Sequence, residues 1–349
     1  MYTTIKKPSD YFNTVLYTGN GSTQSISGIN FRPDLVWIKK RSATSDHMWH
    51  DIARGVTNAI RSNTTGAENS QSNYLTAFDS DGFTVGSSND VNTNGSTFAS
   101  WNWLASNTTV SNTDGSITST VSANTTSGFS IVSYTGTGST ATVGHGLGVT
   151  PKMIITKNRS SVETWRPYHV ALGAGQALAL NDVNATDTDA AYWSNTEPTS
   201  SVFTVGTTAG TNGSGNSMIA YCFAEVKGFS KFGSYIGNGN ADGTFIYTGF
   251  KPAFVIFKKT SAVGNWAMLD STRSYANVAN HTLATNSSNA ESSFGGGESV
   301  FGASNKVDIV SNGIKIREAS DYNNASGATF IYMAFAEEPL VGDNPATAR

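Results

Sequence analysis

Three stretches of the sequence follow one pattern: FRPDLVWIKKRS (residues 31–42), VTPKMIITKNRS (149–160) and FKPAFVIFKKTS (250–261). Each has a proline, then a short continuously apolar run, then basic or polar residues. A continuous apolar run of this length is typical of a central β-strand that is covered on both faces. A proline two residues ahead fits the start of a strand, because no ladder hydrogen bond is lost there. The pattern therefore predicts a buried strand in three places.

The same landmarks surround each of these runs. An aromatic residue and a glycine turn precede the proline by 16 or 17 residues, in YTGNGST (17–23), YTGTGST (134–140) and YIGNGNA (235–241). A tryptophan follows the proline by 14 to 16 residues, at Trp49, Trp165 and Trp266. An alternating strand closes each set, in GSTFASWNWLA (95–105), GNSMIAYCFAE (215–225) and GATFIYMAFAE (327–337). Four landmarks repeated three times in one order indicate a tandem array of three homologous units.

Composition points to an all-β protein. Only 13% of the 349 residues are charged, and polarity comes instead from Ser, Thr, Asn and 35 Gly, which favour turns and strand surfaces over helices. Turn clusters follow every eight to twelve residues. FDSDGF (78–83) and VSNGI (310–314) predict tight hairpins. We expect three tandem homologous β-sandwich, jelly-roll-like domains, with a barrel as the alternative. Only residues 54–62 and 169–180 have a pattern compatible with a short helix.

The glycine turns themselves are weak candidates for a site. They lack the lysine of a phosphate-binding loop and its strand–loop–helix context. Because glycine tolerates positive φ, a hairpin turn at the start of each unit explains the glycine pair without a ligand.

The landmarks divide the chain into segments. We expect an N-terminal arm (1–11), a first sandwich (12–105), a Ser/Thr/Asn-rich linker (106–127), a second sandwich (128–227), a third sandwich (228–338) and a C-terminal tail (339–349). Units two and three follow each other almost directly, so their relative orientation should be fixed, whereas the linker leaves the first unit freer. We expect the two ends to be ordered only where they dock on a neighbour. The sequence leaves a pseudo-threefold arrangement and an extended array both open.

Charge and hydropathy exclude several classes of function. The net charge is only −3, which gives no basic field for nucleic acid or anionic lipid. No run approaches the roughly 18 apolar residues of a membrane span, so we expect no membrane insertion. The first residues, MYTTIKKPSDYF, do not resemble a secretory signal. The single cysteine, Cys222, excludes an intrachain disulfide framework and a cysteine-based metal site.

One stretch, DHMWHD (46–51), gathers potential metal ligands, with His47 and His50 three residues apart. On a strand these two side chains would face opposite ways, which disfavours shared ligation. In a loop or helical turn they could share a metal ion, and a solvated polar loop is the competing interpretation. We expect no cofactor elsewhere.

Aromatic residues suggest a sugar-binding role at one position. The repeated Trp49, Trp165 and Trp266 are interpreted as core residues, because a side chain present at one place in every unit belongs to the fold. Trp193 in AYWSN has no counterpart in the first unit and is the candidate to stack on a glycan.

No catalytic residues emerge. Acidic residues are scattered in turns and at strand ends, so no pair flanks a scissile bond as glycoside hydrolysis needs. No Gly-x-Ser-x-Gly elbow with His and Asp partners is present. We therefore expect a non-enzymatic protein.

Several motifs together resemble known proteins. PSDYFNTVLYTGNGSTQSI (8–26), FRPDLVWIKKRS, AFDSDGFTVG (77–86), SKFGSYIGNG (230–239) and IYMAFAEEPLVGDNPATAR (331–349) are similar to tail-fibre and virion structural proteins of tailed bacteriophages of marine bacteria. The similarity covers essentially the whole chain. It implies a structural protein of the virion that is made in a bacterial cytoplasm and present in several copies. No site residues follow from it.

The expected function combines the three-unit all-β architecture with the resemblance to phage structural proteins. We expect a tail fibre or a head-surface fibre or decoration protein. It would assemble with itself, with a trimer favoured, and with other virion proteins of tail or capsid. The alternative is a carbohydrate-binding adhesin that contacts a host surface glycan, and a polysaccharide depolymerase is the third candidate.

Overall fold

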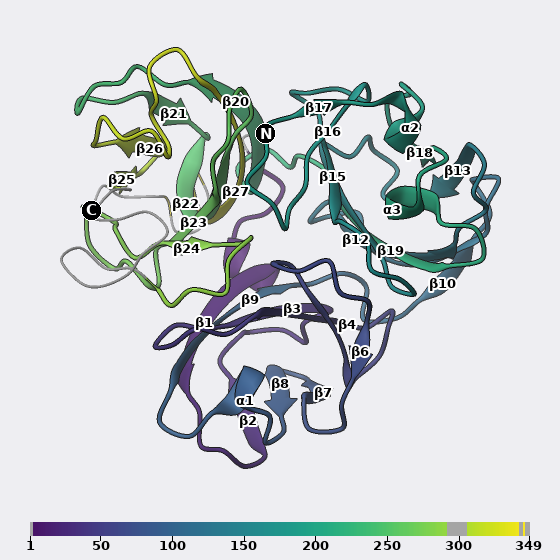
Figure 1. Cartoon of the computed structure of the whole chain (residues 1–349). Helices are drawn as coiled ribbons and strands as arrows, with labels where there is room; N and C mark the ends of the chain where they lie inside the picture. The colour runs from purple at the N-terminus through teal and green to yellow at the C-terminus, as the bar shows by residue number, and fades with distance from the viewer. Residues whose placement is uncertain (1–2, 292–305, 342–344, 346–349) are drawn as a thin grey trace.

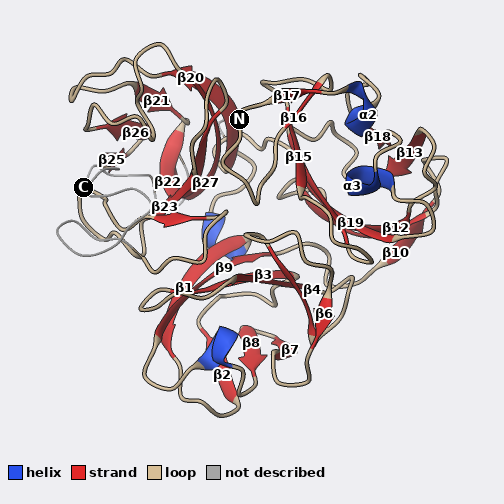
Figure 2. Ribbon diagram, in the orientation of Figure 1, coloured by secondary structure: helices blue, strands red, loops and turns tan. Residues whose placement is uncertain are grey.

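The chain is nearly all β, as expected, and its sheets are antiparallel (Figure 2). The computed structural model describes residues 3–291, 306–341 and 345. Its helices are single short turns: η1 (Pro8–Asp10), α1 (Asn89–Asn92), α2 (Ala190–Trp193) and α3 (Ala209–Asn212). None of the helices in these ranges has the length and apolar character that crossing a bilayer requires.

Unit 1 carries strands β1 to β9 in two sheets. The inner sheet has the order β1-β9-β3-β4-β5-β6 and the outer sheet the order β2-β8-β7. The inner strands are β1 (Phe12–Thr18), β9 (Thr97–Trp103), β3 (Leu35–Lys40), β4 (His47–Asp51), β5 (Asn58–Arg61) and β6 (Asn69–Ser70). The outer strands are β2 (Gln24–Ser27), β8 (Gly82–Val85) and β7 (Leu75–Asp79).

Unit 2 carries strands β10 to β19, and its inner sheet has the order β10-β11-β12-β19-β14-β15. The inner strands are β10 (Val110–Asn112), β11 (Ser119–Asn124), β12 (Phe129–Thr135), β19 (Ser217–Phe223), β14 (Met153–Asn158) and β15 (Arg166–His169). Two strand pairs complete the unit: β13 (Ala141–Gly144) with β18 (Val202–Val205), and β16 (Gln176–Ala177) with β17 (Asp187–Thr188).

Residues 106–127, which have linker composition but in which 117–121 could dock as an edge strand, supply strands β10 and β11. These two strands extend the inner sheet beside β12. The polar composition of this stretch suits an edge, where one side of the strand faces water. Neither stretch whose pattern is compatible with a short helix forms one. In 169–180, β15 ends at His169 and β16 follows at Gln176, and in 54–62 of unit 1 turns lead into β5.

Unit 3 carries strands β20 to β27. Its inner sheet has the order β20-β27-β22-β23-β24 and its outer sheet the order β21-β26-β25. The inner strands are β20 (Ser230–Ile236), β27 (Thr329–Pro339), β22 (Phe250–Lys259), β23 (Trp266–Asp270) and β24 (Leu283–Ala284). The outer strands are β21 (Phe245–Tyr247), β26 (Gly313–Ile316) and β25 (Val307–Val310).

The strand patterns behave as predicted within each unit. The three proline-led runs form β3, β14 and β22, each between two other strands of an inner sheet. In β9, Ala99, Trp101 and Trp103 face one hydrophobic cluster, while Phe98 faces another. The hairpins expected at Asp-Gly and Asn-Gly connect β7 with β8 and β25 with β26.

The three units are arranged as a closed ring. Figure 1 shows three lobes around a common centre, one for each unit, with the inner sheets turned toward that centre. One buried cluster draws side chains from all three inner sheets. Each unit keeps a second cluster between its inner and outer layers. Of the two arrangements that the sequence left open, the chain therefore adopts the pseudo-threefold one.

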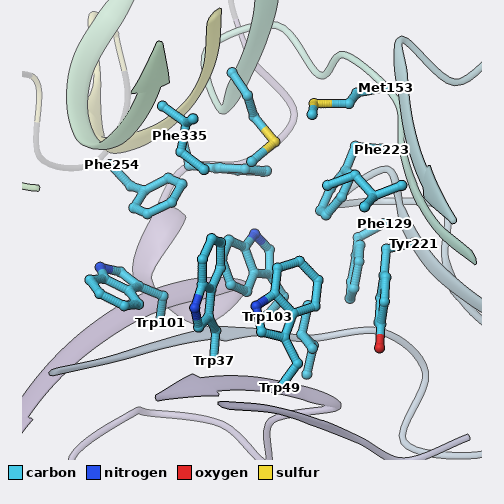
Figure 3. Packing of buried hydrophobic residues seen from close by; sticks show 14 of the residues in the cluster. Trp37, Trp49, Trp101, Trp103, Phe129, Met153, Tyr221, Phe223, Phe254 and Phe335 are labelled. Carbon is cyan, nitrogen blue, oxygen red and sulfur yellow. The ribbon is translucent and has the colours of Figure 1, made fainter. Parts of the chain in front are cut away.

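Aromatic side chains fill the centre of the ring (Figure 3). Trp103 of unit 1 has its ring centroid 6.3 Å from that of Phe223 in unit 2 and 5.7 Å from that of Phe254 in unit 3. Phe12 stacks on Phe335 at 5.2 Å. Each buried aromatic side chain contributes on the order of 2–3 kcal/mol relative to exposure. This shared core covers the second face of the central strands, which is why β3 and β14 are buried along their whole length.

The N-terminal arm docks on unit 3. Ile5 is buried in the central cluster, and η1 lies against β27. The surface on which this arm docks belongs to the same chain. Most of the expected tail, residues 339–349, lies outside the described residues.

Candidate functional site

The best-defined polar features of the molecule lie where one unit meets the next. At each of these three seams, a hairpin loop of one unit donates a backbone hydrogen bond to the loop after β5, or its counterpart, in the preceding unit. The bonds run from the amide nitrogen to the carbonyl oxygen, from Glu163 to Thr65 (2.9 Å), from Gly264 to Val183 (2.8 Å) and from Ser45 to Ser288 (2.9 Å). The equal register at all three places shows that the seams are related by the pseudo-threefold.

A fully buried lysine reinforces each seam. Its ammonium nitrogen donates to the carbonyl of the next residue in its own strand and to a carbonyl across the seam. The bonds across the seam join Lys39 to Ser288 (3.2 Å), Lys157 to Thr65 (3.2 Å) and Lys258 to Val183 (3.1 Å). Burial lowers the pKa of Lys39 to about 7, and the pKa values of Lys157 and Lys258 to about 8.

The three landmark tryptophans are buried in the central cluster, as expected of core residues. Two of them also bond across the seams, and the residue of unit 1 that is equivalent to these two is His47 and not Trp49. The indole nitrogens of Trp165 and Trp266 donate across a seam to the carbonyls of Arg61 and Ala179, each at 2.8 Å. Trp266 pairs with the seam lysine Lys258, and Trp165 directly precedes Arg166, the partner of Thr156 next to Lys157. In unit 1 the residue that pairs with Lys39 is His47. His47 follows Pro33 by 14 residues, the spacing found in the other two units.

An asparagine confirms the equivalence of His47 with these two tryptophans. The backbone nitrogens of His47, Trp165 and Trp266 each receive the same side-chain cap at 2.9 Å, from Asn63, Asn181 and Asn286. Trp49 lies two residues further along β4 and is buried in the central cluster, as a core residue should be.

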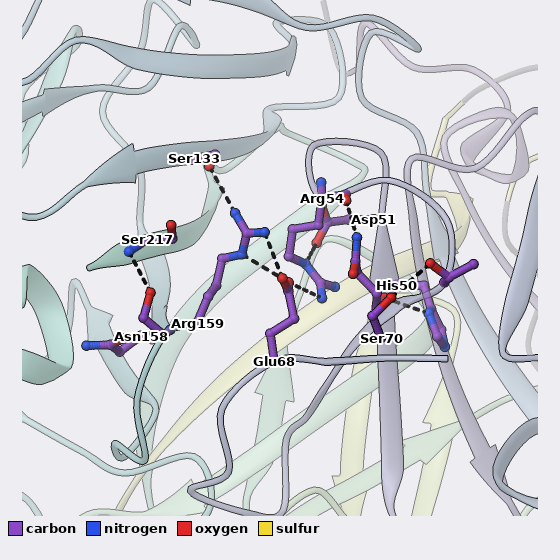
Figure 4. A network of polar contacts seen from close by, with 12 residues as sticks. His50, Asp51, Arg54, Glu68, Ser70, Ser133, Asn158, Arg159 and Ser217 are labelled. Carbon is purple, nitrogen blue, oxygen red and sulfur yellow. Dashed lines mark hydrogen bonds and ion pairs between the residues drawn. The ribbon is translucent and has the colours of Figure 1, made fainter. Parts of the chain in front are cut away.

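An ionic network crosses the seam between units 1 and 2 (Figure 4). Glu68 of unit 1 accepts from Arg159 of unit 2 at 2.8 and 3.0 Å and from Arg54 of its own unit at 3.2 Å. Arg54 is fully buried and pairs with Asp51, which also accepts from the Tyr221 hydroxyl of unit 2 at 2.6 Å. Burial lowers the pKa of Arg54, but the charge of Asp51 more than offsets it, so the guanidinium stays charged.

The seam between units 3 and 1 repeats this network. Glu291 accepts from Arg41 of unit 1 at 2.7 and 2.9 Å and from Arg273 of unit 3 at 2.9 Å. Asp270 pairs with Arg273 and accepts from the indole nitrogen of Trp101 at 3.0 Å. Burial would raise the pKa of Glu291, but Arg273 and Arg41 outweigh it and hold the pKa at about 2.

The seam between units 2 and 3 has the same backbone hydrogen bonds as the other two seams, but different side chains. Thr186 and Thr260 stand where the other seams have a glutamate and an arginine, and the Thr186 nitrogen donates to the Thr260 carbonyl at 3.0 Å. His169 replaces the aspartate and hydrogen-bonds through Nε2 to the Tyr332 carbonyl at 3.2 Å. Burial lowers the pKa of His169 to about 4, so this seam carries no buried charge from that imidazole at neutral pH.

The predicted metal pair is not brought together. His47 and His50 lie on β4, a strand, where they pair with Lys39 and Val36 and so face opposite sides. His47 Nδ1 accepts from the indole of Trp37 at 2.9 Å, and His50 Nδ1 bonds to the Asn58 carbonyl at 2.9 Å. Burial lowers the pKa of both imidazoles. In the described part of the chain no three His, Cys, Asp or Glu side chains converge as metal ligands.

Trp193, the predicted glycan contact, is not at the surface. Trp193 is only 2% exposed and packs edge-on against Tyr168 within unit 2, with ring centroids 5.9 Å apart. A buried indole presents no face to a sugar. AYWSN lacks a counterpart in unit 1 because unit 2 inserts the short helix α2 there, which covers its own core.

The glycine turns are corners at which the chain passes from the inner to the outer sheet. Each corner is held by a buried asparagine that the sequence did not single out. Each turn connects an inner strand with an outer one and is not a hairpin, since β1 pairs with β9 and β2 with β8. A Cβ on Gly19 would lie 2.3 Å from the Thr93 carbonyl oxygen, and Gly21 has φ +72°. The buried side chain of Asn92 accepts from the Asn20 nitrogen at 2.8 Å and donates to the Gly86 carbonyl at 2.9 Å. Asn212 and Asn324 make the same contacts in units 2 and 3.

The seams join the units, and the corners join the two sheets of each unit. The buried lysines, arginines, carboxylates and asparagines described above form hydrogen bonds or ion pairs with other groups of the protein. The thiol of Cys222 is fully buried, and burial raises its pKa, so it is not a reactive thiolate. The arrangement is suited to mechanical linkage of three units.

Comparison with known proteins agrees with a single three-unit module. No curated protein matches the chain. The family model described as Domain of unknown function (DUF7483) matches residues 7–339, which takes in the docked arm, all three units and all three seams. The chain therefore belongs to the DUF7483 family, and what that family model spans is the whole ring of three units.

Proposed function

We propose that this protein is a non-enzymatic structural component of a bacteriophage virion, in a tail fibre or on the head surface, built from three tandem jelly-roll-like β-sandwich units. The observation that carries the proposal is the set of three equivalent seams, each with the same backbone bond and the same buried lysine. The resemblance of the motifs at 8–26 and 331–349 to phage structural proteins supplies the context.

Rigidity supports a mechanical role. The central aromatic core and the two ionic networks fix the units relative to one another, and low charge with many Ser, Thr and Asn residues leaves a neutral polar surface. A pseudo-threefold ring also presents three similar faces around one axis, a geometry suited to contacts with symmetric neighbours. We propose that the chain assembles with itself, as a trimer, and with other virion proteins.

The location is tested on particles of a phage that encodes the chain. Gradient-purified virions should contain the protein by mass spectrometry, and electron microscopy with a specific antibody should place the label on tail or head. The same detection on disrupted particles is the control for protein that only adheres loosely to the virion. The absence of the chain from intact, infectious particles would overturn the proposal.

Self-assembly has its own measurement. Light scattering on the purified chain should give about three times the 36.8 kDa mass of one chain. A monodisperse species at 36.8 kDa across the concentrations found in assembly would contradict the trimer.

The second candidate, a carbohydrate-binding adhesin, is favoured by one specific observation, a pair of exposed aromatic residues in unit 3. A depolymerase gains no such support, and we expect no release of reducing ends when the chain is incubated with host polysaccharide.

A further inference from the structure

Unit 3 departs from the threefold repeat on the outward face of strand β21. In this strand Ile246 points into the core, whereas Phe245 and Tyr247 are 44% and 58% exposed. Cross-strand pairing fixes the equivalent positions in the other units, because Ile26 pairs with Phe83, Val143 with Phe203, and Ile246 with Ile314. The residues equivalent to the two aromatics are Ser25 and Ser27 in unit 1 and Thr142 and Gly144 in unit 2.

The fold gives no reason for aromatic side chains at these two positions. Units 1 and 2 form the same strand pair with small residues there, and the buried position of the strand is filled in all three units. Two large rings left in water on a sheet face are unfavourable unless something covers them. Their presence in one unit alone therefore indicates a contact that the other units do not make.

Glycines lie beneath both rings. A Cβ on Gly249 would lie 3.6 to 3.8 Å from atoms of the Tyr247 side chain, and a Cβ on Gly313 would lie 3.1 Å from Cζ of Phe245. Each ring thus lies close over backbone on one side. Two residues along a strand separate the rings by about 7 Å. The result is a pair of aromatic surfaces side by side on one face of a sheet.

Hydrogen-bonding groups surround the pair. Lys315 lies directly across from Phe245 and forms an ion pair with Asp242 at 2.7 Å. On the other side, Tyr247 borders a groove of about 450 Å³ whose wall includes Glu225 and Lys231, which pair with each other at 2.8 Å. Aromatic faces between fixed polar groups are the usual composition of a specific ligand site.

We propose that Phe245 and Tyr247 form a carbohydrate-binding platform, with Lys315 and Asp242 at one end and the groove at the other. A pyranose ring has an apolar C–H face that stacks on an aromatic ring and a rim of hydroxyls that bond to charged side chains. A stable protein partner would need about 800 Å² on each side, far more than two side chains provide, whereas successive sugar units fit this surface. The source of the glycan, a host-surface polysaccharide, rests on the proposed function; the platform itself does not.

The test is affinity electrophoresis of the full chain in gels that contain dextran, mannan, agarose or alginate, together with an array of bacterial surface polysaccharides. The wild-type chain should be retarded by at least one of them. The double variant Phe245→Ser/Tyr247→Ser, which installs the residues of unit 1, should raise the dissociation constant at least tenfold. Its thermal unfolding should match that of the wild type, because both side chains are exposed.

A matched control is Tyr275→Ser, which removes another exposed tyrosine of unit 3 (85% exposed) that lies neither on β21 nor in the wall of the groove, and it should leave retardation unchanged. Absence of binding to every polysaccharide would overturn the proposal, as would equal retardation of the wild type and the double variant. A double variant that changes the mass in light scattering without changing retardation would assign the face to a protein contact and also overturn it. None of these outcomes bears on whether the chain is present in virions, so the two proposals fail separately.

Discussion

The three seam lysines make stability depend on pH in a definite direction. Each is buried against backbone carbonyls and has a pKa of about 7 to 8 in the folded chain, against about 10.4 when unfolded. Between these values the unfolded chain binds more protons, so the free energy of unfolding rises with pH. Up to about pH 7 the buried ammonium groups lower the free energy of unfolding by their full desolvation cost. This cost disappears as the pH approaches 10, because the folded lysines lose their protons.

In the variant Lys157→Met, the free energy of unfolding should rise less steeply with pH, because one of the three seam lysines is removed. From pH 7 to 9.5 the variant's gain in unfolding free energy should be about 1–2 kcal/mol smaller than that of the wild type. The Thr65 carbonyl keeps the Glu163 amide as a donor, so the variant should still fold. Urea unfolding at several pH values measures the slope. Lys152→Met, at a partly exposed lysine just before β14, is the control, and an identical slope in wild type and Lys157→Met would refute the account.

Glu68 is the residue on which the seam between units 1 and 2 depends most. It pairs with both Arg54 and Arg159. Glu68→Gln therefore removes the carboxylate partner that Arg159 has in this network and leaves Arg54 paired with Asp51 alone. We expect a loss of about 2–4 kcal/mol in unfolding free energy. The equivalent position in the seam between units 2 and 3, where no carboxylate–arginine network is present among the described residues, provides the matched control. Thr186→Val removes the hydroxyl bond to the Thr260 carbonyl and should cost less than about 1 kcal/mol. Equal losses at the two positions would show that the network does not stabilise the seam.

At the scale of elements, the corner between inner and outer sheets depends on one buried amide. Asn92→Ala removes the acceptor for the Asn20 nitrogen and the donor to the Gly86 carbonyl. Buried groups left without partners cost about 1–3 kcal/mol each, so we expect a loss of roughly 3 kcal/mol. Asn94→Ala, an exposed turn residue of the same loop, should change stability by less than about 0.5 kcal/mol. A loss below 1 kcal/mol for Asn92→Ala would mean that water replaces the amide.

The elements that the sequence predicted are those with a strong local pattern. The runs around Val36, Ile154 and Val255 became central strands, and the closing strands alternate as expected, because burial on both faces or on one leaves a clear periodicity. The corners were mistaken for hairpins, since a glycine pair specifies backbone freedom and not which sheet the next strand joins. Residues 169–180 resembled a helix but lie beside a seam, where contacts with unit 3 outweigh local propensity.

One landmark and one candidate site were misassigned for a related reason. Trp49 is a core residue as expected, but matching by residue type made it the equivalent of Trp165 and Trp266. Constant spacing from the proline selects His47 instead, and only the contacts across the seams distinguish the two. Trp193 was chosen because it breaks the repeat, but its burial depends on an insertion in unit 2. The exposed pair Phe245 and Tyr247 breaks the repeat too. Its exposure follows from the pairing register of β21, which the sequence alone does not give.

At the scale of the whole molecule, ring closure predicts that the three units unfold together. The central cluster belongs to no single unit: Trp103 packs on Phe223 of unit 2 and Phe254 of unit 3. Loss of one unit would expose the inner sheets of the other two. Calorimetry should therefore show one transition whose van't Hoff and calorimetric enthalpies agree.

A substitution confined to one unit separates cooperative from independent unfolding. Phe203 is buried in the cluster between the layers of unit 2 and is not part of the central cluster. Phe203→Ala should cost about 3–5 kcal/mol, and in a coupled ring the single transition should move down by several degrees as a whole. Trp103→Ala, in the shared core, should move the same transition without splitting it. If the units were independent, Phe203→Ala would shift only one of several transitions and leave the others in place, because the seams would then transmit too little energy to make the ring one cooperative unit.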